Sequence, residues 1–172
     1  MAPGSRSLLI VEDEEEIREI LTESLQGLVD EFILAENGQE ALDIVKGRPV
    51  DAIVSDINMP KLDGLKFLSA LRDAGLHTPF VVLTGYGDKR IAVEALRHGA
   101  MDFLDKPWDP EELRKVVGKA IEVGHELNRF GHASPEADFL NEIKEGNALA
   151  GVERLVRIVE ALVLENSKLR KR

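Results

Sequence analysis

Short apolar runs alternate with stretches of helical periodicity along the first two thirds of the chain. The apolar runs, which we interpret as strands, cover residues 7–11, 32–35, 52–55, 80–84 and 101–104. Each has the usual length of a strand and is almost continuously aliphatic, which is typical of strands buried on both faces of a parallel sheet. Between them, residues such as Ile17, Leu21 and Leu25 recur every three or four positions, as in helices with one buried face. We therefore predict an α/β fold with a doubly wound, five-stranded parallel sheet covered by helices.

The alternation stops after about Glu122, and the rest of the chain has a purely helical pattern. Residues 131–135 interrupt the periodicity, and the serine–proline pair at their end is a typical helix start. Beyond it lies a broad apolar stripe that contains Asn166, a polar residue of the kind that sets the register of a coiled coil. The stripe needs cover from a helix of a second copy or from the domain's own last helix. We expect one domain over residues 1–125 and a helical extension over residues 126–172 for dimerisation, linkage or partner binding.

The composition excludes several classes of protein. Hydrophobic residues make up 44% of the 172 residues and charged residues 31%, as in globular proteins. No apolar run approaches the ~20 residues of a membrane-spanning helix, so we expect no membrane segment. The net charge of −10 argues against direct nucleic-acid binding, which needs clustered positive charge. Because the chain has no cysteine, disulfides and thiolate metal sites are excluded, and we expect a cytoplasmic location.

Four of the apolar runs end on residues that phosphoryl chemistry uses. The pair Glu12 and Asp13 follows the first run, and Asp56, Thr84 and Lys106 follow later ones. Because the carboxyl ends of parallel strands share one edge of a sheet, we expect these side chains to form a single pocket. Converging carboxylates repel one another unless a hard divalent cation lies between them, and Mg²⁺ is the usual ion for phosphate chemistry.

Within such a pocket, a carboxylate can attack a phosphoryl group and carry it as an acyl phosphate. We predict that Asp56 is this nucleophile, that Lys106 supplies positive charge to the phosphate oxygens and that Thr84 supplies a hydroxyl donor. Taken singly, the acids at residues 12–16 fit a solvated first helical turn, and Lys106 fits an exposed charge. Their combination favours the pocket. A lone helical histidine such as His125 is usually a surface residue, and we assign it no phosphate-carrying role.

From Ser7 to about Glu122 the chain resembles the receiver domain of two-component response regulators. The shared motifs are Glu12-Asp13, Ser55-Asp56-Ile57-Asn58-Met59-Pro60, Asp63-Gly64, Leu83-Thr84-Gly85 and Phe103-Leu104-Asp105-Lys106-Pro107. The resemblance implies the flavodoxin-like receiver fold with Asp56 as the phospho-acceptor. It also implies that Asp13 binds Mg²⁺ directly, that Glu12 holds it largely through water and that the backbone carbonyl of Asn58 is a further ligand.

The same resemblance assigns the remaining positions. It implies that Lys106 and Thr84 contact the phosphate, and that Phe103 is the aromatic switch residue whose rotation is coupled to movement of Thr84. Two positions depart from the commonest family pattern: Glu12 stands where many receivers have Asp, and Phe103 lacks the hydroxyl of the tyrosine often found there. The first departure affects the metal geometry, and the second leaves packing alone to distinguish the two rotamers of the ring.

We therefore expect a response regulator that accepts a phosphoryl group from a histidine kinase or phosphotransfer protein in a phosphorelay, with Mg²⁺ as cofactor. It would catalyse only its own phosphorylation and dephosphorylation, and would then change its protein contacts or oligomeric state. We expect a homodimer through the C-terminal helix. Three alternatives stay open: a receiver fragment of a larger regulator whose effector domain has been cut off, a constitutive helical adaptor with an idle pocket, and a stand-alone phosphatase of the acyl-phosphate type.

Overall fold

Five strands alternate with five helices in the part of the chain that the computed structural model describes, residues 5–85 and 89–131. In chain order they are β1 (Ser7–Val11), α1 (Glu15–Ser24), β2 (Glu31–Ala35), α2 (Gly38–Gly47), β3 (Ala52–Asp56), α3 (Gly64–Asp73), β4 (Phe80–Thr84), α4 (Lys89–Arg97), β5 (Asp102–Asp105) and α5 (Pro110–Gly131). The helix start near Ser134 and the stripe around Asn166 lie outside the described residues. No helix in the described ranges is long and apolar enough to span a bilayer.

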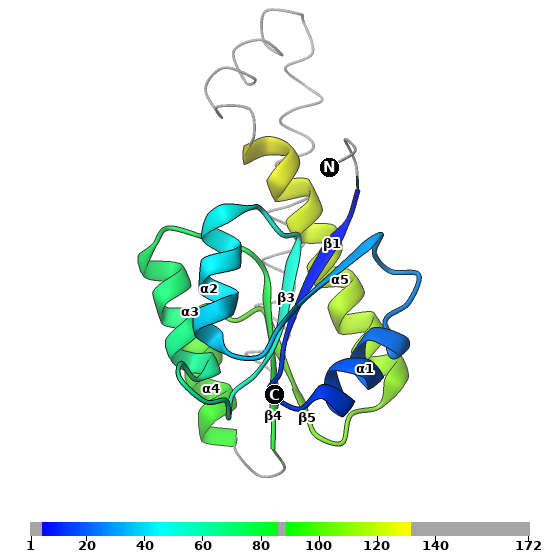
Figure 1. The fold of residues 1–172 in the computed structure, drawn as a ribbon, viewed down its shortest axis with the longest axis vertical. Helices are drawn as coiled ribbons and strands as arrows, with labels where there is room; N and C mark the ends of the chain where they lie inside the picture. Colours follow the sequence, from blue (N-terminus) through cyan, green and yellow to red (C-terminus); the bar gives the residue numbers. More distant parts are fainter. Residues whose placement is uncertain (1–4, 86–88, 132–172) are drawn as a thin grey trace, which may run out of the picture. The chain divides into compact units, whose positions relative to one another are not determined.

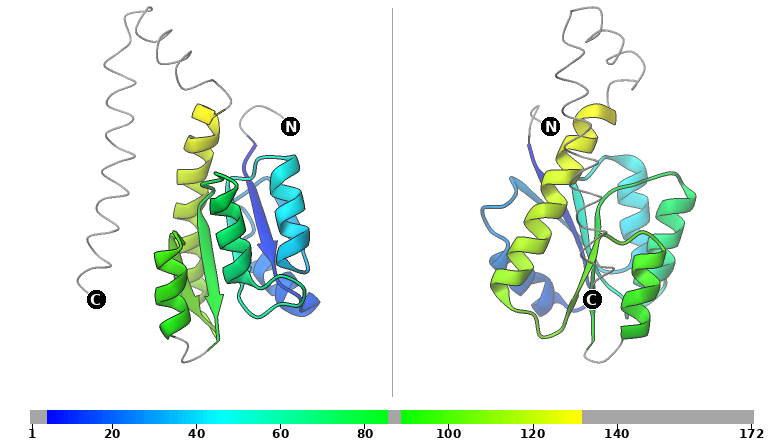
Figure 2. Two further views of the ribbon diagram at one scale, coloured as in Figure 1. Left: turned by 90° about the vertical axis from the view of Figure 1, so that its left-hand side faces the viewer. Right: turned by 180° about the vertical axis from the view of Figure 1, so that it is seen from behind.

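The five strands form one parallel sheet in the order β2-β1-β3-β4-β5. Helices α1 and α5 cover one face of the sheet, and α2, α3 and α4 cover the other (Figures 1 and 2). This arrangement confirms the predicted doubly wound sheet. Strands β1, β3 and β4 are buried along their whole length, because each lies inside the sheet with helices on both of its faces.

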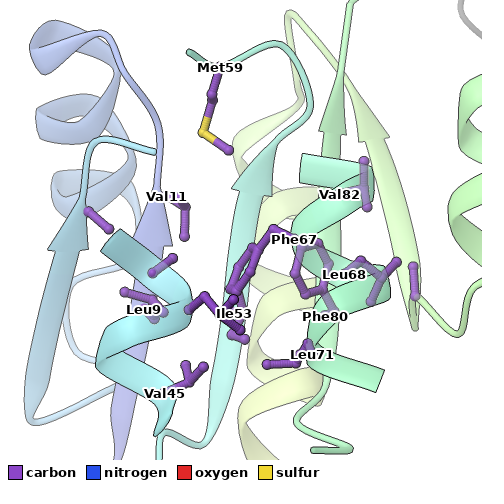
Figure 3. Close-up of a cluster of buried hydrophobic side chains, with 14 of the residues drawn as sticks. Leu9, Val11, Val45, Ile53, Met59, Phe67, Leu68, Leu71, Phe80 and Val82 are labelled. Carbon is purple, nitrogen blue, oxygen red and sulfur yellow. The ribbon is translucent and has the colours of Figure 1, made fainter. Parts of the chain in front are cut away.

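Two hydrophobic clusters lie on opposite faces of the sheet. On the α2–α4 side, the rings of Phe67 and Phe80 pack 5.4 Å apart at 58°, among fully buried aliphatic side chains such as Leu9 and Ile53 (Figure 3). On the α1 and α5 side, the alternate residues of the strands meet apolar side chains of both helices, Leu21 among them. Neighbouring residues of one strand thus feed opposite clusters, which holds the strand ends in fixed positions.

Some element boundaries differ from those predicted. Strand β5 begins one residue later than expected and reaches Asp105, because its pairing with β4 continues as far as Thr84. Helix α5 runs to Gly131, so the domain boundary that we expected between residues 125 and 126 falls inside a continuous helix. The apolar periodicity ends near Ile121, but polar contacts continue beyond it.

These contacts join the last turns of α5 to the amino end of β3. The side chain amide of Asn128 donates to the Asp51 carboxylate at 2.9 Å and to the Val50 carbonyl at 3.1 Å. The Nδ1 atom of His125 lies 3.3 Å from the same carboxylate, and its side chain is only 15% exposed. The expectation that His125 is a surface residue was therefore wrong: it lies beside a buried acid that the sequence analysis did not identify.

Candidate functional site

Three carboxylates converge at the carboxyl edge of the sheet, the lower edge in Figure 1. Glu12 and Asp13 follow β1 directly, and Asp56 is the last residue of β3, the neighbouring strand. Ligand oxygens from the three side chains lie within 4.8 Å of one another. Glu12 and Asp56 are buried, whereas Asp13 is exposed, so the cluster is open to solvent on one side.

Lys106 enters the cluster from the end of β5. Its Nζ atom lies 2.7 Å from Oε2 of Glu12 and 3.4 Å from Oδ1 of Asp56. The backbone amide of Lys106 donates to the Thr84 carbonyl at 2.7 Å, and the peptide bond to Pro107 is cis. The sheet thus brings together four of the side chains that we predicted would meet, from three separate strand ends.

Burial and neighbouring charges shift the pKa values of Glu12 and Lys106. Burial raises the pKa of Glu12, the hydrogen bond from Lys106 lowers it, and the charge of Asp56 raises it further. The net result is a pKa above the ordinary value of a glutamate. Burial lowers the pKa of Lys106, but the hydrogen bond to Glu12 and the charges of Asp56 and Glu12 outweigh it, so the pKa is raised. The contacts with Glu12 and Asp56 therefore favour the charged form of the ammonium.

Thr84 and Phe103 lie on the adjacent strands β4 and β5. The Thr84 hydroxyl donates to Oδ1 of Asp105 at 2.8 Å, and Thr84 is only 1% exposed. Phe103 is half-buried and packs against the cluster that contains Phe67 and Phe80. In this structure the threonine hydroxyl is therefore engaged by a neighbouring carboxylate, a partner that the sequence analysis missed.

The loop after β3 fixes the backbone around Asp56. The amide of Gly64 donates to the Ile57 carbonyl at 2.9 Å, and a Cβ atom on Gly64 would lie 2.2 Å from the Asp56 carbonyl oxygen. The side chain of Asp63 caps α3 by accepting from the Lys66 amide at 2.9 Å. Asn58 is exposed in this loop, two residues after Asp56, and its role as a ligand stays a prediction.

The donor set suits a hard divalent cation. Mg²⁺ binds oxygen at about 2.0–2.1 Å and keeps several of its waters, so it needs only a few protein oxygens. The oxygens of Glu12, Asp13 and Asp56, all within 4.8 Å of one another, are close enough to share one ion directly or through such waters. Without a cation, only Lys106 is seen to offset the charge of Glu12 and Asp56 in the described part of the chain.

Arg18 contacts the loop between β1 and α1, which carries Glu12 and Asp13, and its role was not identified from the sequence. It lies on α1, is 9% exposed, and its guanidinium donates to the backbone carbonyls of Glu12 and Asp13. The sequence did contain a signal for its burial. Arg18 stands three positions before Leu21 and seven before Leu25, on the apolar stripe of the helix. A charged residue on a buried stripe indicates a specific partner, but the spacing does not say which one.

Comparisons with known proteins all indicate the same family. The family model of the response regulator receiver domain matches residues 8–118. The regulatory protein AtoC of Escherichia coli is 39% identical over 118 residues, which are 67% of this chain and 25% of AtoC. The transcriptional regulatory protein PhoP of Bacillus subtilis, named for alkaline phosphatase synthesis, is 34% identical over 147 residues, 86% of this chain and 59% of PhoP. The chain thus aligns with a quarter to three fifths of these relatives.

Solved structures agree with this assignment. The receiver domain of the Francisella response regulator 1452 is 29% identical, with a TM-score of 0.64, and the match covers 68% of this chain and 97% of that one. The match therefore takes in nearly the whole of that domain and leaves about a third of this chain outside it.

Proposed function

Because the chain belongs to the response regulator receiver domain family, whose members are signalling proteins of two-component systems, we propose that it accepts a phosphoryl group on Asp56 in a Mg²⁺-dependent reaction. Receiver domains interact with histidine kinases or phosphotransfer proteins, and we propose a phosphohistidine of such a partner as the donor. The single observation that carries the proposal is the convergence of Glu12, Asp13 and Asp56 with the ammonium of Lys106 at one strand edge.

In the proposed transfer, an Asp56 carboxylate oxygen attacks the phosphorus atom. A P–O bond to Asp56 forms as the P–N bond to the donor imidazole breaks, and the imidazole leaves with the electron pair of that bond. Lys106 already contacts Oδ1 of Asp56 at 3.4 Å, so its charge is in place for a phosphoryl oxygen at this position. The hydrogen bond from the Gly64 amide to the Ile57 carbonyl orients the backbone that follows Asp56.

A bound Mg²⁺ would neutralise part of the charge on the carboxylates and phosphoryl oxygens. We propose Asp13 and Asp56 as its direct side chain ligands, Glu12 as a ligand largely through water and the carbonyl of Asn58 as a further one. Glu12 is the buried acid whose pKa is raised, so a nearby cation would favour its ionised form. The same residues then catalyse loss of the phosphoryl group to water, and no external substrate is turned over.

We further propose that phosphorylation moves the Thr84 hydroxyl from Asp105 to a phosphate oxygen. The hydroxyl has one proton to donate, and it is held at 2.8 Å by Asp105 in this structure. A new anion on Asp56 competes for that proton, and we propose that the movement of Thr84 is coupled to rotation of the Phe103 ring. The equilibrium between the two arrangements is then biased by phosphorylation.

Mass measurement of the intact chain tests this proposal. With Mg²⁺ and acetyl phosphate as a small donor, we expect the mass to rise by one phosphoryl group, and EDTA to abolish the rise. Asp56→Asn should prevent it, whereas Asp43→Asn, which removes an exposed acid on α2, should not. Persistence of the added mass in Asp56→Asn would contradict the assignment of the acceptor, and a wild-type chain that gains no mass would support the idle-pocket alternative.

The output is proposed to lie in protein contacts made by residues 126–172, including a homodimer. This proposal rests on the apolar stripe around Asn166 in the sequence. The relatives named above are longer regulators, so a larger regulator with this receiver as one part is the alternative output. Light scattering should give the molar mass of a dimer for the full chain, and a monomer at all concentrations would contradict the homodimer.

A further inference from the structure

The guanidinium of Arg18 reaches the loop that carries two of the three acids. Its Nη1 atom donates to the carbonyl oxygen of Glu12 and, at 3.1 Å, to that of Asp13. Its Nη2 atom lies 3.7 Å from Oε1 of Glu36, an acid that is 70% exposed. The strong contacts of this buried arginine are therefore with the backbone of the acidic loop, and its contact with a side chain carboxylate is a weak one.

The helix that carries Arg18 is anchored mainly through its carboxyl-terminal half. Leu21 and Leu25 are fully buried against the sheet, and the partly buried Ile17 packs on the same cluster. Just past the carboxyl end of the helix, Arg114 of α5 donates to the carbonyls of Ser24 and Gln26. Arg18 thus projects from a rigid element, and its hydrogen bonds constrain the more open loop.

The loop is held from its other side as well. The Glu12 amide donates to the Ala35 carbonyl of β2 at 3.1 Å, while the Glu12 carbonyl accepts from Arg18. The peptide groups on both sides of Glu12 are therefore oriented, and the next carbonyl, of Asp13, is oriented by the same guanidinium. The direction of a side chain follows from the orientation of its backbone.

We propose that Arg18 is a positioning residue that holds the β1–α1 loop in the orientation in which the oxygens of Glu12, Asp13 and Asp56 share one divalent cation. The inference rests on the proposed function. Among the described residues, Arg18 makes no hydrogen bond to a side chain oxygen of Glu12, Asp13 or Asp56. It therefore acts through the backbone. Partners that orient metal ligands typically change metal affinity about 10–100-fold when they are removed.

The sign of the effect separates this role from simple electrostatics. Arg18 is a positive charge near a proposed cation site, so its removal would strengthen cation binding if charge alone mattered. Loss of loop orientation has the opposite effect. Arg18→Met removes both the charge and the donors. Arg18→Lys keeps the charge but replaces the planar Nη1 group, which donates to both carbonyls, by a tetrahedral and more strongly hydrated ammonium on a flexible stem.

The experiment is an EPR titration of the full chain with Mn²⁺, whose free aquated ion is detected directly, with Mg²⁺ as competitor. We expect Arg18→Met to weaken Mn²⁺ binding about tenfold and Arg18→Lys to weaken it by about threefold or more. The matched control is Arg114→Met, which also removes an arginine that donates to two backbone carbonyls, but at the other end of α1. Its Mn²⁺ affinity should stay within about twofold of wild type.

A second readout is the rate of phosphorylation against Mg²⁺ concentration. Saturating Mg²⁺ should restore the rate in Arg18→Met, since weakened binding is overcome by mass action. Unchanged or tighter Mn²⁺ binding in folded Arg18→Met overturns the inference and leaves the proposed function intact. If that variant does not fold, Arg18→Lys decides, and wild-type affinity in it overturns the inference. A wild-type chain that binds no divalent cation overturns both proposals.

Discussion

Gly64 shows how one small residue positions the proposed phospho-acceptor. A methyl group at this position would lie 2.2 Å from the Asp56 carbonyl oxygen and 3.0 Å from the Ile57 Cα atom, both backbone atoms of the strand end. We predict that Gly64→Ala shifts this strand end, lowers the free energy of unfolding by about 1–3 kcal/mol and slows phosphorylation of Asp56. Urea denaturation and the rate of mass increase with acetyl phosphate measure the two effects.

The control for this substitution is Gly47→Ala in α2. A methyl group there has no atom within 4 Å, and alanine reduces the conformational freedom of the unfolded chain, so the change should be neutral or slightly stabilising. Equal stability and equal phosphorylation rates in Gly64→Ala and the wild type would show that the strand end tolerates the added group.

The chemistry-bearing residues were predictable as a set, because each stands at or just after the end of an apolar run and the predicted parallel sheet brings those ends to one edge. Glu12, Asp56 and Lys106 could be placed at one sheet edge by topology alone. The contacts of Arg18 and Asp105 could not be predicted, because a hydrogen bond to a carbonyl oxygen or to a neighbouring hydroxyl leaves no spacing pattern in the sequence. The sequence therefore indicates which residues gather, and the structure is needed to find what orients them.

At the scale of the elements, the start of α3 depends on the charge of Asp63. Burial raises the pKa of this carboxyl, but hydrogen bonds from the Lys66 side chain and amide outweigh it, so the pKa lies below its ordinary value. A lowered pKa contributes stability that is present above the unfolded-state value and is lost as the pH falls through the folded-state value. Asp63→Ala should cost about 0.5–1 kcal/mol at pH 7, less than a fully buried cap because the site is partly exposed.

This difference between wild type and Asp63→Ala should shrink as the pH falls below the ordinary carboxyl range, when the wild-type side chain becomes protonated. Urea denaturation at neutral and acid pH measures it. A difference that is constant with pH would show that the cap acts only as a neutral hydrogen-bond acceptor.

The last turns of α5 depend on polar contacts with the amino end of β3. Asn128→Ala removes two hydrogen bonds and leaves the buried Asp51 carboxylate with fewer donors, so we expect a loss of about 1–3 kcal/mol in the free energy of unfolding. Hydrogen exchange of the α5 amides should accelerate most after Gly124. The exposed Glu122→Ala on the same helix should change stability by no more than about 0.5 kcal/mol, and an equal loss in both variants would contradict the anchor.

The carboxyl end of helix α5 could not be predicted from the apolar pattern. Apolar residues repeat regularly as far as Ile121, but the turns that follow are fixed by His125 and Asn128, which contact Asp51. The apolar repeat alone therefore does not mark where this helix ends. By contrast, strands β1 and β4 were predicted to the residue, since their aliphatic runs coincide with their pairing in the sheet.

At the scale of the whole molecule, we expect the acidic cluster of the site to lower the stability of the fold. The chain has a net charge of −10, and three of its acids are gathered within 4.8 Å at one edge. Lys106 offsets part of their charge, and we expect the remaining repulsion to destabilise the folded chain when no cation is bound. Binding of a cation to the folded state alone stabilises it in proportion to the logarithm of the cation concentration.

Asp13→Asn separates these two effects, because it removes one of the three charges at the exposed side of the cluster. In EDTA we expect its Tm to exceed that of wild type by about 2–4 °C, equivalent to about 1 kcal/mol for a chain of this size. Added Mg²⁺ should raise the Tm of wild type and have much less effect on the variant. Glu19→Gln removes an exposed acid on α1 and should leave both values unchanged within about 1 °C. A variant that melts below wild type in EDTA would show that Asp13 stabilises the metal-free fold, and repulsion within the cluster would then be too weak to make cation binding a source of stability.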